Sequence, residues 1–194
     1  MALCQLFYNK YYYDNHSRRI ILGINPGRLG GGLTGIPFTD PIHLERNCGI
    51  QNTLDKKLEF SSTFVYEMIN ACGGPEIFYS RLYFSSLSPL GFIKDDKNLN
   101  YYDDIKLQKK LESFMIESIN KQLKFNIDRS IAYCLGEGQN YKYLSQLNEK
   151  HQFFDKIVPL AHPRFIMQYK RKQKEEYINS YKEAFEFIPE KAAS

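Results

Sequence analysis

The segment that decides the fold is residues 19–41, RIILGINPGRLGGGLTGIPFTDP. Its first six residues are mostly apolar and predict a buried strand, which Asn25-Pro26-Gly27 then ends, because Pro and Gly favour turns. The glycines that follow allow positive φ angles and a close approach of the backbone to a ligand. A strand that runs into such a loop is typical of a ligand site in an α/β protein.

Three further apolar runs end in Gly, Pro or polar residues in the same way. Residues 82–84 lead into a Ser-Ser-Leu-Ser-Pro stretch, residues 130–135 stop at Gly-Glu-Gly, and residues 157–161 stop at His-Pro-Arg. Each run predicts a buried strand. Pro159 confines the last one to an edge or an end of the sheet, because proline has no N–H to donate.

Helical patterns lie between and after these strands. We expect four helices: one capped by Ser61 or Ser62 and ended by Gly73-Gly74-Pro75, one over residues 104–123 with Leu107, Leu111, Phe114, Ile119 and Leu123 at helical spacing, one around residues 141–147, and one around residues 169–185. The alternation predicts a doubly wound α/β fold, with a central, mostly parallel four-stranded sheet and helices on both faces. A chain of 194 residues fits one core, so we expect a single domain over residues 1–194.

The composition excludes several classes of protein. Hydrophobic residues make up 43% and charged residues 25%, which is ordinary for a globular chain. No apolar run is long enough to cross a bilayer, and no secretory signal begins the sequence, so we expect a cytoplasmic protein. The four cysteines form no close pair, which argues against zinc and iron–sulfur sites. We expect no metal and no cofactor. The net charge of +4 permits a polyanionic partner without demanding one.

The glycine-rich loop does not match the common phosphate-binding motifs. Neither GxGxxG nor GxxxxGK[ST] occurs in it, which argues against a nucleotidase or a kinase. Because the carboxyl ends of parallel strands meet at one edge of a sheet, we expect Asn25, Ser86, Gly136 and His162 to line one crevice.

Three motifs, in this order, resemble the uracil-DNA glycosylase superfamily, and most of all its single-strand-selective monofunctional branch. They are GINPG at residues 23–27, TGIPF at residues 34–38, and the His-Pro pair at residues 162–163. A fourth family element, Asn-His-Cys-Pro-Leu, corresponds here to Ser-Leu-Ser-Pro-Leu at residues 86–90. The resemblance spans residues 20–165. Within that branch, the sequence is most similar to a bacterial offshoot.

The resemblance implies a monofunctional DNA glycosylase of base excision repair. Such an enzyme hydrolyses the N-glycosidic bond of uracil, or of another deaminated base, after the base has been flipped out of DNA. By resemblance, Asn25 holds the attacking water and His162 donates a hydrogen bond to the departing base. Phe38 would stack on the flipped ring, while Ile24 and Gly27 would line the substrate site.

The sequence departs from the family in two motifs. Ser86 stands where relatives read the base with an asparagine, and a hydroxyl group cannot replace both functions of an amide. Strict uracil selection is therefore an open question, with xanthine or hypoxanthine as alternatives and Ser85 or a loop backbone group as an alternative reader. The late motif continues with residues that relatives do not share, so Arg164, Phe165 or Met167 is the expected wedge into the duplex.

We expect DNA, either single-stranded or as a lesion-containing duplex, to be the partner of a monomeric protein without a membrane or obligate protein partner. Five residues are expected to bind DNA: Arg28, Gly35, Gly136, Arg164 and Lys170. The amides of the Gly-Glu-Gly turn would face a phosphate, as helix N-termini often do. Asp40 either assists the water or caps a turn.

Two alternatives to a glycosylase remain open at this point. The chain could bind a nucleobase or damaged DNA without cutting it, or it could be an unrelated hydrolase that uses Asn25 and His162 on a small substrate. No lysine stands in the motifs, so a Schiff base is not expected, and an active enzyme would be monofunctional.

Overall fold

A sheet of four parallel strands forms the centre of the computed structural model, which describes residues 2–187. Its strands are β1 (Arg18–Gly23), β2 (Leu82–Ser86), β5 (Ile127–Leu135) and β6 (Lys156–Leu160), in the order β2-β1-β5-β6. The predicted sheet is confirmed, and Pro159 lies in the edge strand β6, as expected. The predicted domain over residues 1–194 also includes residue 1 and residues 188–194, which lie outside the described residues.

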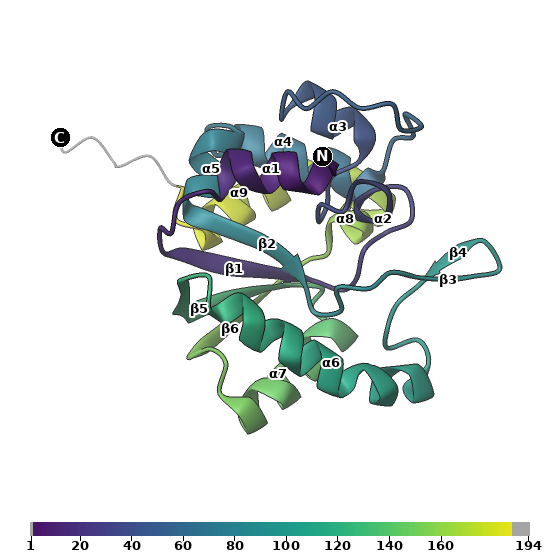
Figure 1. Cartoon of the computed structure of the whole chain (residues 1–194), viewed down its shortest axis with the longest axis vertical. Helices are drawn as coiled ribbons and strands as arrows, with labels where there is room; N and C mark the ends of the chain where they lie inside the picture. Colours follow the sequence, from purple (N-terminus) through teal and green to yellow (C-terminus); the bar gives the residue numbers. More distant parts are fainter. Residues whose placement is uncertain (1, 188–194) are drawn as a thin grey trace.

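Helices cover both faces of the sheet, as predicted (Figure 1). One face carries α1 (Leu3–Tyr11), α4 (Phe60–Ala71), α5 (Pro75–Arg81), α8 (Pro163–Tyr169) and α9 (Lys174–Ala184), and the other carries α6 (Ile105–Leu123) and α7 (Gln139–His151). The short elements are α2 (Gly31–Thr34), α3 (Pro41–Arg46), the 3-10 turn η1 (Arg171–Gln173) and a hairpin of β3 (Phe92–Lys94) and β4 (Lys97–Leu99). Among the described residues, none of the helices has the length and apolar character that a membrane crossing needs.

Alternation along the strands fills two cores. In β1, Ile20 and Leu22 are fully buried against α6 and α7, while Ile21 is fully buried in the core on the opposite face. In β5, Cys134 and Tyr133 divide between the cores in the same way. Each fully buried aliphatic side chain contributes about 1.5–3 kcal/mol to folding. A continuous apolar run is therefore what a strand covered on both faces requires.

Several helix predictions differ from the structure. Glu59, not Ser61 or Ser62, is the N-cap of α4, and both serines are buried within its first turn. Phe114 of α6 is 41% exposed, and its neighbour Met115 takes the buried position. The helix expected over residues 169–185 begins only at Lys174, because α8 ends at Tyr169 and a 3-10 turn over residues 171–173 follows it.

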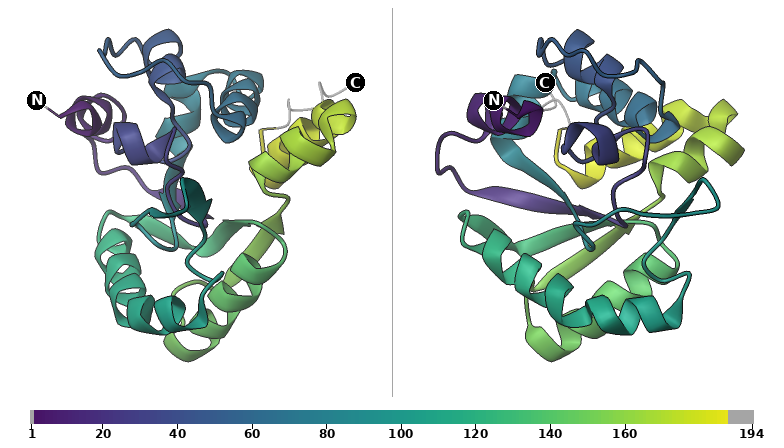
Figure 2. Two further views of the ribbon diagram at one scale, coloured as in Figure 1. Left: turned by 90° about the vertical axis from the view of Figure 1, so that its right-hand side faces the viewer. Right: turned by 45° about the vertical axis from the view of Figure 1, so that its right-hand side comes forward.

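The topology places a ligand site at the end of β1. From β1 the chain crosses first to β2 on one side and later to β5 on the other, so the strand order reverses at β1. Ligands of open α/β sheets bind at such a point, beyond the carboxyl ends of the strands. The strands point to the right in Figure 1, and Figure 2 (left) looks onto this end, where the β3–β4 hairpin projects from the molecule.

Candidate active site

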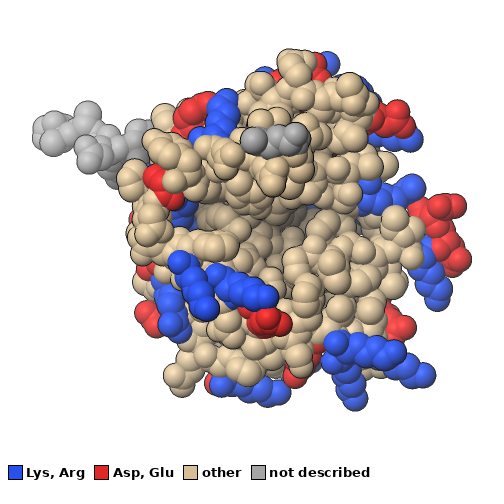
Figure 3. All heavy atoms as spheres, in the orientation of Figure 1, with Lys and Arg blue, Asp and Glu red and all other residues tan. Residues whose placement is uncertain are grey.

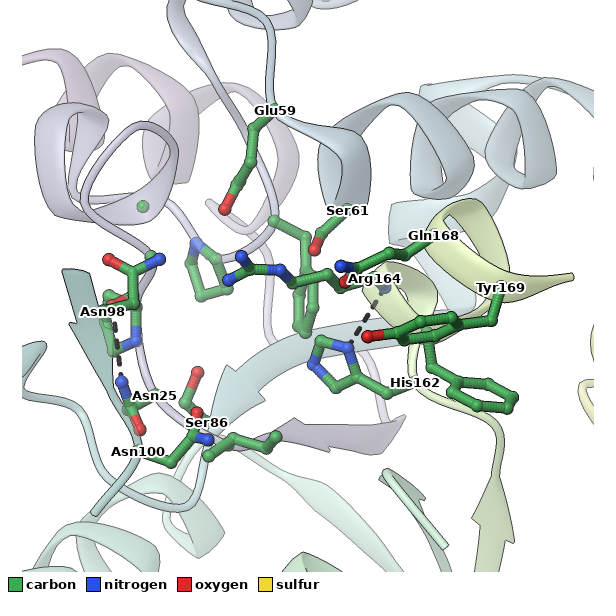
Figure 4. A pocket seen from close by; sticks show the side chains of 17 residues that line it. Asn25, Glu59, Ser61, Ser86, Asn98, Asn100, His162, Arg164, Gln168 and Tyr169 are labelled. Atoms are coloured by element: carbon green, nitrogen blue, oxygen red, sulfur yellow. Dashed lines mark hydrogen bonds between the residues drawn. The ribbon is translucent and has the colours of Figure 1, made fainter. Parts of the chain in front are cut away.

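A pocket of about 270 Å³ opens at the carboxyl end of β1. It brings together seven of the predicted site residues from four sequence-distant segments: Ile24, Asn25, Gly27, Phe38, Ser86, His162 and Arg164 (Figure 4). The crevice expected from the fold is therefore present, although Gly136 does not line it.

The amide group of Asn25 is held in one orientation by the last residue of β4 and the loop that follows it. Its Oδ1 accepts a hydrogen bond from the Tyr101 backbone N–H (3.1 Å), and its Nδ2 donates to the Leu99 carbonyl oxygen (3.3 Å). An amide oxygen has two lone pairs, so Oδ1 keeps one acceptor position for a further donor, such as a water molecule. This arrangement suits a residue that positions water and cannot itself become a strong base.

Phe38 is a rigid platform with a strained backbone. Its φ of 54° lies in the left-handed region, which non-glycine residues rarely adopt unless the surrounding structure holds them there. Thr34 Oγ1 donates to the Thr39 carbonyl oxygen (2.7 Å), and the Thr39 hydroxyl is hydrogen-bonded to Tyr66 (2.9 Å), which together hold the segment. The ring packs against the backbone of Gly23, where a Cβ would lie 2.5 Å from the Phe38 Cζ atom.

The contact between Gly23 and Phe38 makes a testable prediction. The Gly23→Ala variant must displace the ring, so we expect kcat/KM on lesion DNA to fall about 10-fold, within the range for the loss of one base–aromatic stack. Gly138→Ala is the matched control, because a Cβ at Gly138 meets no atom within 4 Å. Single-turnover kinetics and thermal melting of both variants provide the measurement. A Gly23→Ala variant with the parent's rate would show that the ring position does not matter.

His162 follows β6 and is the N-cap of α8. Its Nδ1 accepts a hydrogen bond from the Arg164 backbone N–H (3.1 Å), so in the neutral ring the proton is on Nε2. Burial, helped by the positive charge of Arg164, lowers the pKa of His162 to about 4. The imidazole is therefore neutral at physiological pH and presents a fixed N–H donor. Such a donor can stabilise negative charge that develops on a departing group.

The low pKa of His162 also predicts the pH dependence of stability. In the unfolded chain the imidazole has its ordinary pKa of 6.5, whereas the folded value is about 4. The unfolded state therefore binds the extra proton first, and stability falls as the pH drops from about 6.5 to about 4. We expect urea unfolding at pH 7, 5.5 and 4.5 to show this decline, and His162→Asn to reduce it. An equally steep decline in the variant would contradict the low pKa.

Ser86 is buried at the end of β2 and lines the pocket. It pairs in register with Gly23, and the chain beyond it stays tied to β1, because the Leu87 N–H donates to the Gly23 carbonyl oxygen (2.9 Å). Ser85 does not line this pocket. The expectation that the Ser85 side chain compensates for the missing asparagine is therefore not supported.

Asp40 is a structural residue, which decides between the two roles considered for it. Its carboxylate is fully buried, caps α3 by accepting from the His43 N–H (2.8 Å), and accepts from the Glu59 N–H (2.9 Å). Burial raises the pKa of Asp40, but these bonds and a further one from the His43 ring outweigh it, and the pKa lies below its ordinary value. Asp40 does not line the pocket.

Glu59 is the carboxylate that does line the pocket, and the sequence analysis missed it. Its side chain lies against the glycine-rich loop, where a Cβ would come within 2.3 Å of it at Gly27 and within 2.0 Å at Gly30. Burial, together with the negative charge of Asp40, raises the pKa of Glu59. These two glycines are therefore needed to make room for the Glu59 carboxyl group.

The other predicted DNA contacts lie outside the pocket. Arg28 lines an adjoining cavity, Gly35 ends α2 with a φ of 74°, and Lys170 is exposed at the end of α8. The Gly136 N–H donates to the Leu160 carbonyl oxygen (2.8 Å), so this amide is already used, and the expectation that amides of the Gly-Glu-Gly turn face a phosphate stays a prediction. Met167 is only 7% exposed, which removes it from the expected wedge residues.

Six further residues line the pocket without having been predicted: Glu59, Ser61, Asn98, Asn100, Gln168 and Tyr169. In Figure 4, Glu59 and Ser61 approach from the start of α4, the asparagines from the hairpin side, and Gln168 and Tyr169 from α8. The hairpin did carry a signal, because a pair of aspartates between two short strands is typical of a two-residue turn. Both Asp95 and Asp96 have the positive φ angles of such a turn.

Comparison with known proteins agrees with the motifs. The model of the uracil DNA glycosylase superfamily matches residues 10–186. The crystal structure of wild-type Pedobacter heparinus SMUG2 is similar at a TM-score of 0.91 and 51% sequence identity, over 95% of this chain and 81% of that chain. No curated protein sequence matches the chain. Since the family model covers most of the sequence, and the fold and the pocket follow the same pattern, the chain belongs to the uracil-DNA glycosylase superfamily and is a DNA glycosylase.

Proposed function

We propose that the protein is a monofunctional enzyme that releases a flipped base by a dissociative hydrolysis. The bond between C1′ of the sugar and the base nitrogen breaks, and its electron pair leaves with the base. A water molecule held by Asn25 then adds to C1′ and gives its proton to solvent. The observation that carries this proposal is that Asn25, Phe38 and His162 line one pocket, and that the neutral His162 ring carries its proton on Nε2.

His162 and Phe38 divide the work on the base in this proposal. The neutral imidazole donates to a base oxygen as negative charge develops there, and the fixed donor needs no rearrangement. Flipping costs a few kcal/mol, part of which stacking on Phe38 offsets at about 1–3 kcal/mol per base. Among the described residues that line the pocket none is a lysine, which supports hydrolysis without a Schiff base.

Uracil is the first base to test. Ser86 should accept a wider range of bases than the asparagine that relatives have at this position. A serine hydroxyl group donates or accepts at one position, so it fits several oxygen-bearing pairing edges less selectively than an amide does. The loop between β1 and α2, residues 24–30, is called the catalytic loop here. Ile24 and Gly27 complete the wall of the pocket on the side of this loop. Xanthine and hypoxanthine are therefore the alternative substrates.

DNA backbone contacts are assigned to Arg28, Gly35, Arg164 and Lys170 in this proposal. Figure 3 has the orientation of Figure 1, so the end of the sheet that carries the pocket lies at its right-hand edge, where basic side chains are mixed with acidic ones. We therefore expect few phosphate contacts and a shallow salt dependence, with a slope of about −0.9 per contact on duplex DNA. Phe165, which is 42% exposed and lines the pocket, is the better wedge candidate, because Arg164 is polar.

The experiment is alkali-revealed strand cleavage on labelled oligonucleotides, single- and double-stranded, that carry uracil, xanthine, hypoxanthine or a thymine mismatch. We expect cleavage at uracil after alkali and intact strands before it. Breaks before alkali would contradict the monofunctional mechanism. A folded protein that binds lesion DNA and releases no base would favour the non-catalytic alternative, for which no structural observation speaks.

A monomeric, cytoplasmic protein is also part of the proposal. Cys48, Cys72 and Cys134 are buried free thiols, as expected in a reducing compartment. Light scattering coupled to gel filtration measures the oligomeric state, and a dimer mass would contradict the monomer.

A further inference from the structure

A second cavity, of about 430 Å³, adjoins the base pocket. It lies between the β3–β4 hairpin, the catalytic loop, the start of α4 and α8. Glu59, Ser61, Asn98 and Arg164 line both cavities, so the two share a wall. We call this second cavity the flanking groove. The Arg28 N–H donates to Asn98 Oδ1 (3.0 Å), which ties the catalytic loop to the hairpin along its wall.

The flanking groove has an exposed apolar wall. Phe60, the first residue of α4, is 51% exposed, and its neighbour Leu58 is 53% exposed. Both side chains line the groove. Neither residue contributes to the buried cores, so the fold itself gives no reason for apolar side chains here. Exposed apolar surface beside a polar cavity is a mark of a binding site.

Three cations surround the same groove: Arg28, Lys97 and Arg164. In the described part of the chain, none of the three forms a salt bridge. Two acids, Glu59 and Asp96, also line it, and the Glu59 carboxyl group lies against the catalytic loop at the boundary with the base pocket. An aromatic ring among unpaired cations is the combination that binds single-stranded nucleic acid.

We propose that the flanking groove binds the nucleotide next to the flipped one, with its base stacked on Phe60 and its phosphate held by Arg28 and Lys97. The occupant is a nucleotide because the groove adjoins the base pocket and shares four lining residues with it, and a flipped nucleotide is covalently linked to its neighbours. The inference rests on the DNA glycosylase activity of the chain. It assigns a second recognition position beside the damaged base.

The test removes either the ring or the neighbouring base, and then both. Binding is measured to a single-stranded oligonucleotide with 2′-fluoro-deoxyuridine, whose glycosidic bond resists cleavage, and to two copies with an abasic spacer on the 5′ or the 3′ side. For the parent protein we expect one spacer to weaken binding about 5- to 150-fold, the effect of one lost stack. Phe60→Ala should weaken binding to intact DNA by a similar factor and show no further loss with that spacer.

Matched variants separate stacking from general effects. Phe60→Tyr keeps a ring and should bind as the parent does. Phe125→Ala removes an equally exposed ring (55%) that lies with Arg18 and Ile127 at the far end of the sheet, and it should change nothing. Lys97→Ala should reduce the salt slope of binding to the single strand by about 0.7, whereas Lys150→Ala, in the last turn of α7, should not.

Each remaining outcome overturns the proposal. If the losses from Phe60→Ala and from the spacer multiply, the base does not stack on this ring. If neither spacer affects the parent protein, the groove holds no neighbouring base. If Phe60→Ala changes only the association state in sedimentation, the apolar wall is a contact between copies. Release of uracil from the intact strand is measured in parallel, so a failure of the glycosylase activity itself would be recognised separately.

Discussion

Replacement of Asn25 by alanine is expected to reduce base release by at least about 10²-fold, the effect of misplacing a reacting group by about 1 Å. In the parent protein the amide is oriented by backbone groups of Leu99 and Tyr101, and one lone pair of Oδ1 remains for the water. Alanine leaves the sugar in place but removes the group that positions water beneath it. We therefore expect single-turnover rates to collapse while lesion binding persists.

The control for this variant is a neighbouring amide in the same pocket. Asn100 also lines it, and its own side chain donates to Asp103 Oδ1 (3.4 Å). Asn100→Ala should lower the rate far less than Asn25→Ala does. Both variants lose one amide side chain, and thermal melting detects any difference in folding. An Asn25→Ala protein that releases base at the parent's rate would refute the assignment of the water to Asn25.

The second large effect is expected at His162. Its Nε2–H donor is fixed before the reaction, and removal of one such donor from a site of developing negative charge costs about 10²–10³-fold in rate. His162→Ala should therefore slow base release by that factor. The rate constant for chemistry should fall, while the dissociation constant for lesion DNA changes little, because the bond to the base oxygen strengthens mainly in the transition state.

A pH profile distinguishes this role from a structural one. The parent's imidazole is neutral down to a pH of about 4, so its donor should work unchanged between pH 8 and pH 6. An acid limb centred near pH 6.5 would mean that His162 has its ordinary pKa and is exposed to solvent. His162→Asn keeps an N–H donor on a shorter side chain, and partial rescue by it would support hydrogen bonding. Full activity of His162→Ala would remove the histidine from the mechanism.

Strand positions and the ends of the sheet were predictable from the sequence because apolar runs and their Gly and Pro stops are local signals. The position of Asn25 at the carboxyl end of β1 follows directly from the Asn-Pro-Gly sequence that ends this strand. The strained φ of Phe38 was not predictable, because it depends on Thr39 and Tyr66, which meet only in the folded chain. Long-range packing, rather than the preference of the residue itself, sets that backbone angle.

Glu59 shows where sequence reasoning fails at a site. Nothing around it resembles a motif, and the residue lies 29 positions beyond Gly30, whose missing Cβ makes room for it. Serine is a preferred N-cap residue and glutamate is not, so the sequence predicts Ser61 or Ser62 as the cap of this helix. Only the fold reveals that the helix is capped two or three residues earlier and that Glu59 directs a carboxyl group into the pocket.

The cap of α8 links two properties of the enzyme that are usually measured separately. The bond from the Arg164 N–H to His162 Nδ1 both begins the helix and decides which ring nitrogen carries the proton. Whenever the first turn of α8 opens, Nδ1 loses its partner and the proton is free to change sides. The fraction of molecules ready for chemistry is thus the fraction in which this turn is closed. Hydrogen exchange at the Arg164 amide therefore reports, in the absence of DNA, the fraction of molecules in which this turn is open and the Nε2–H donor is not fixed.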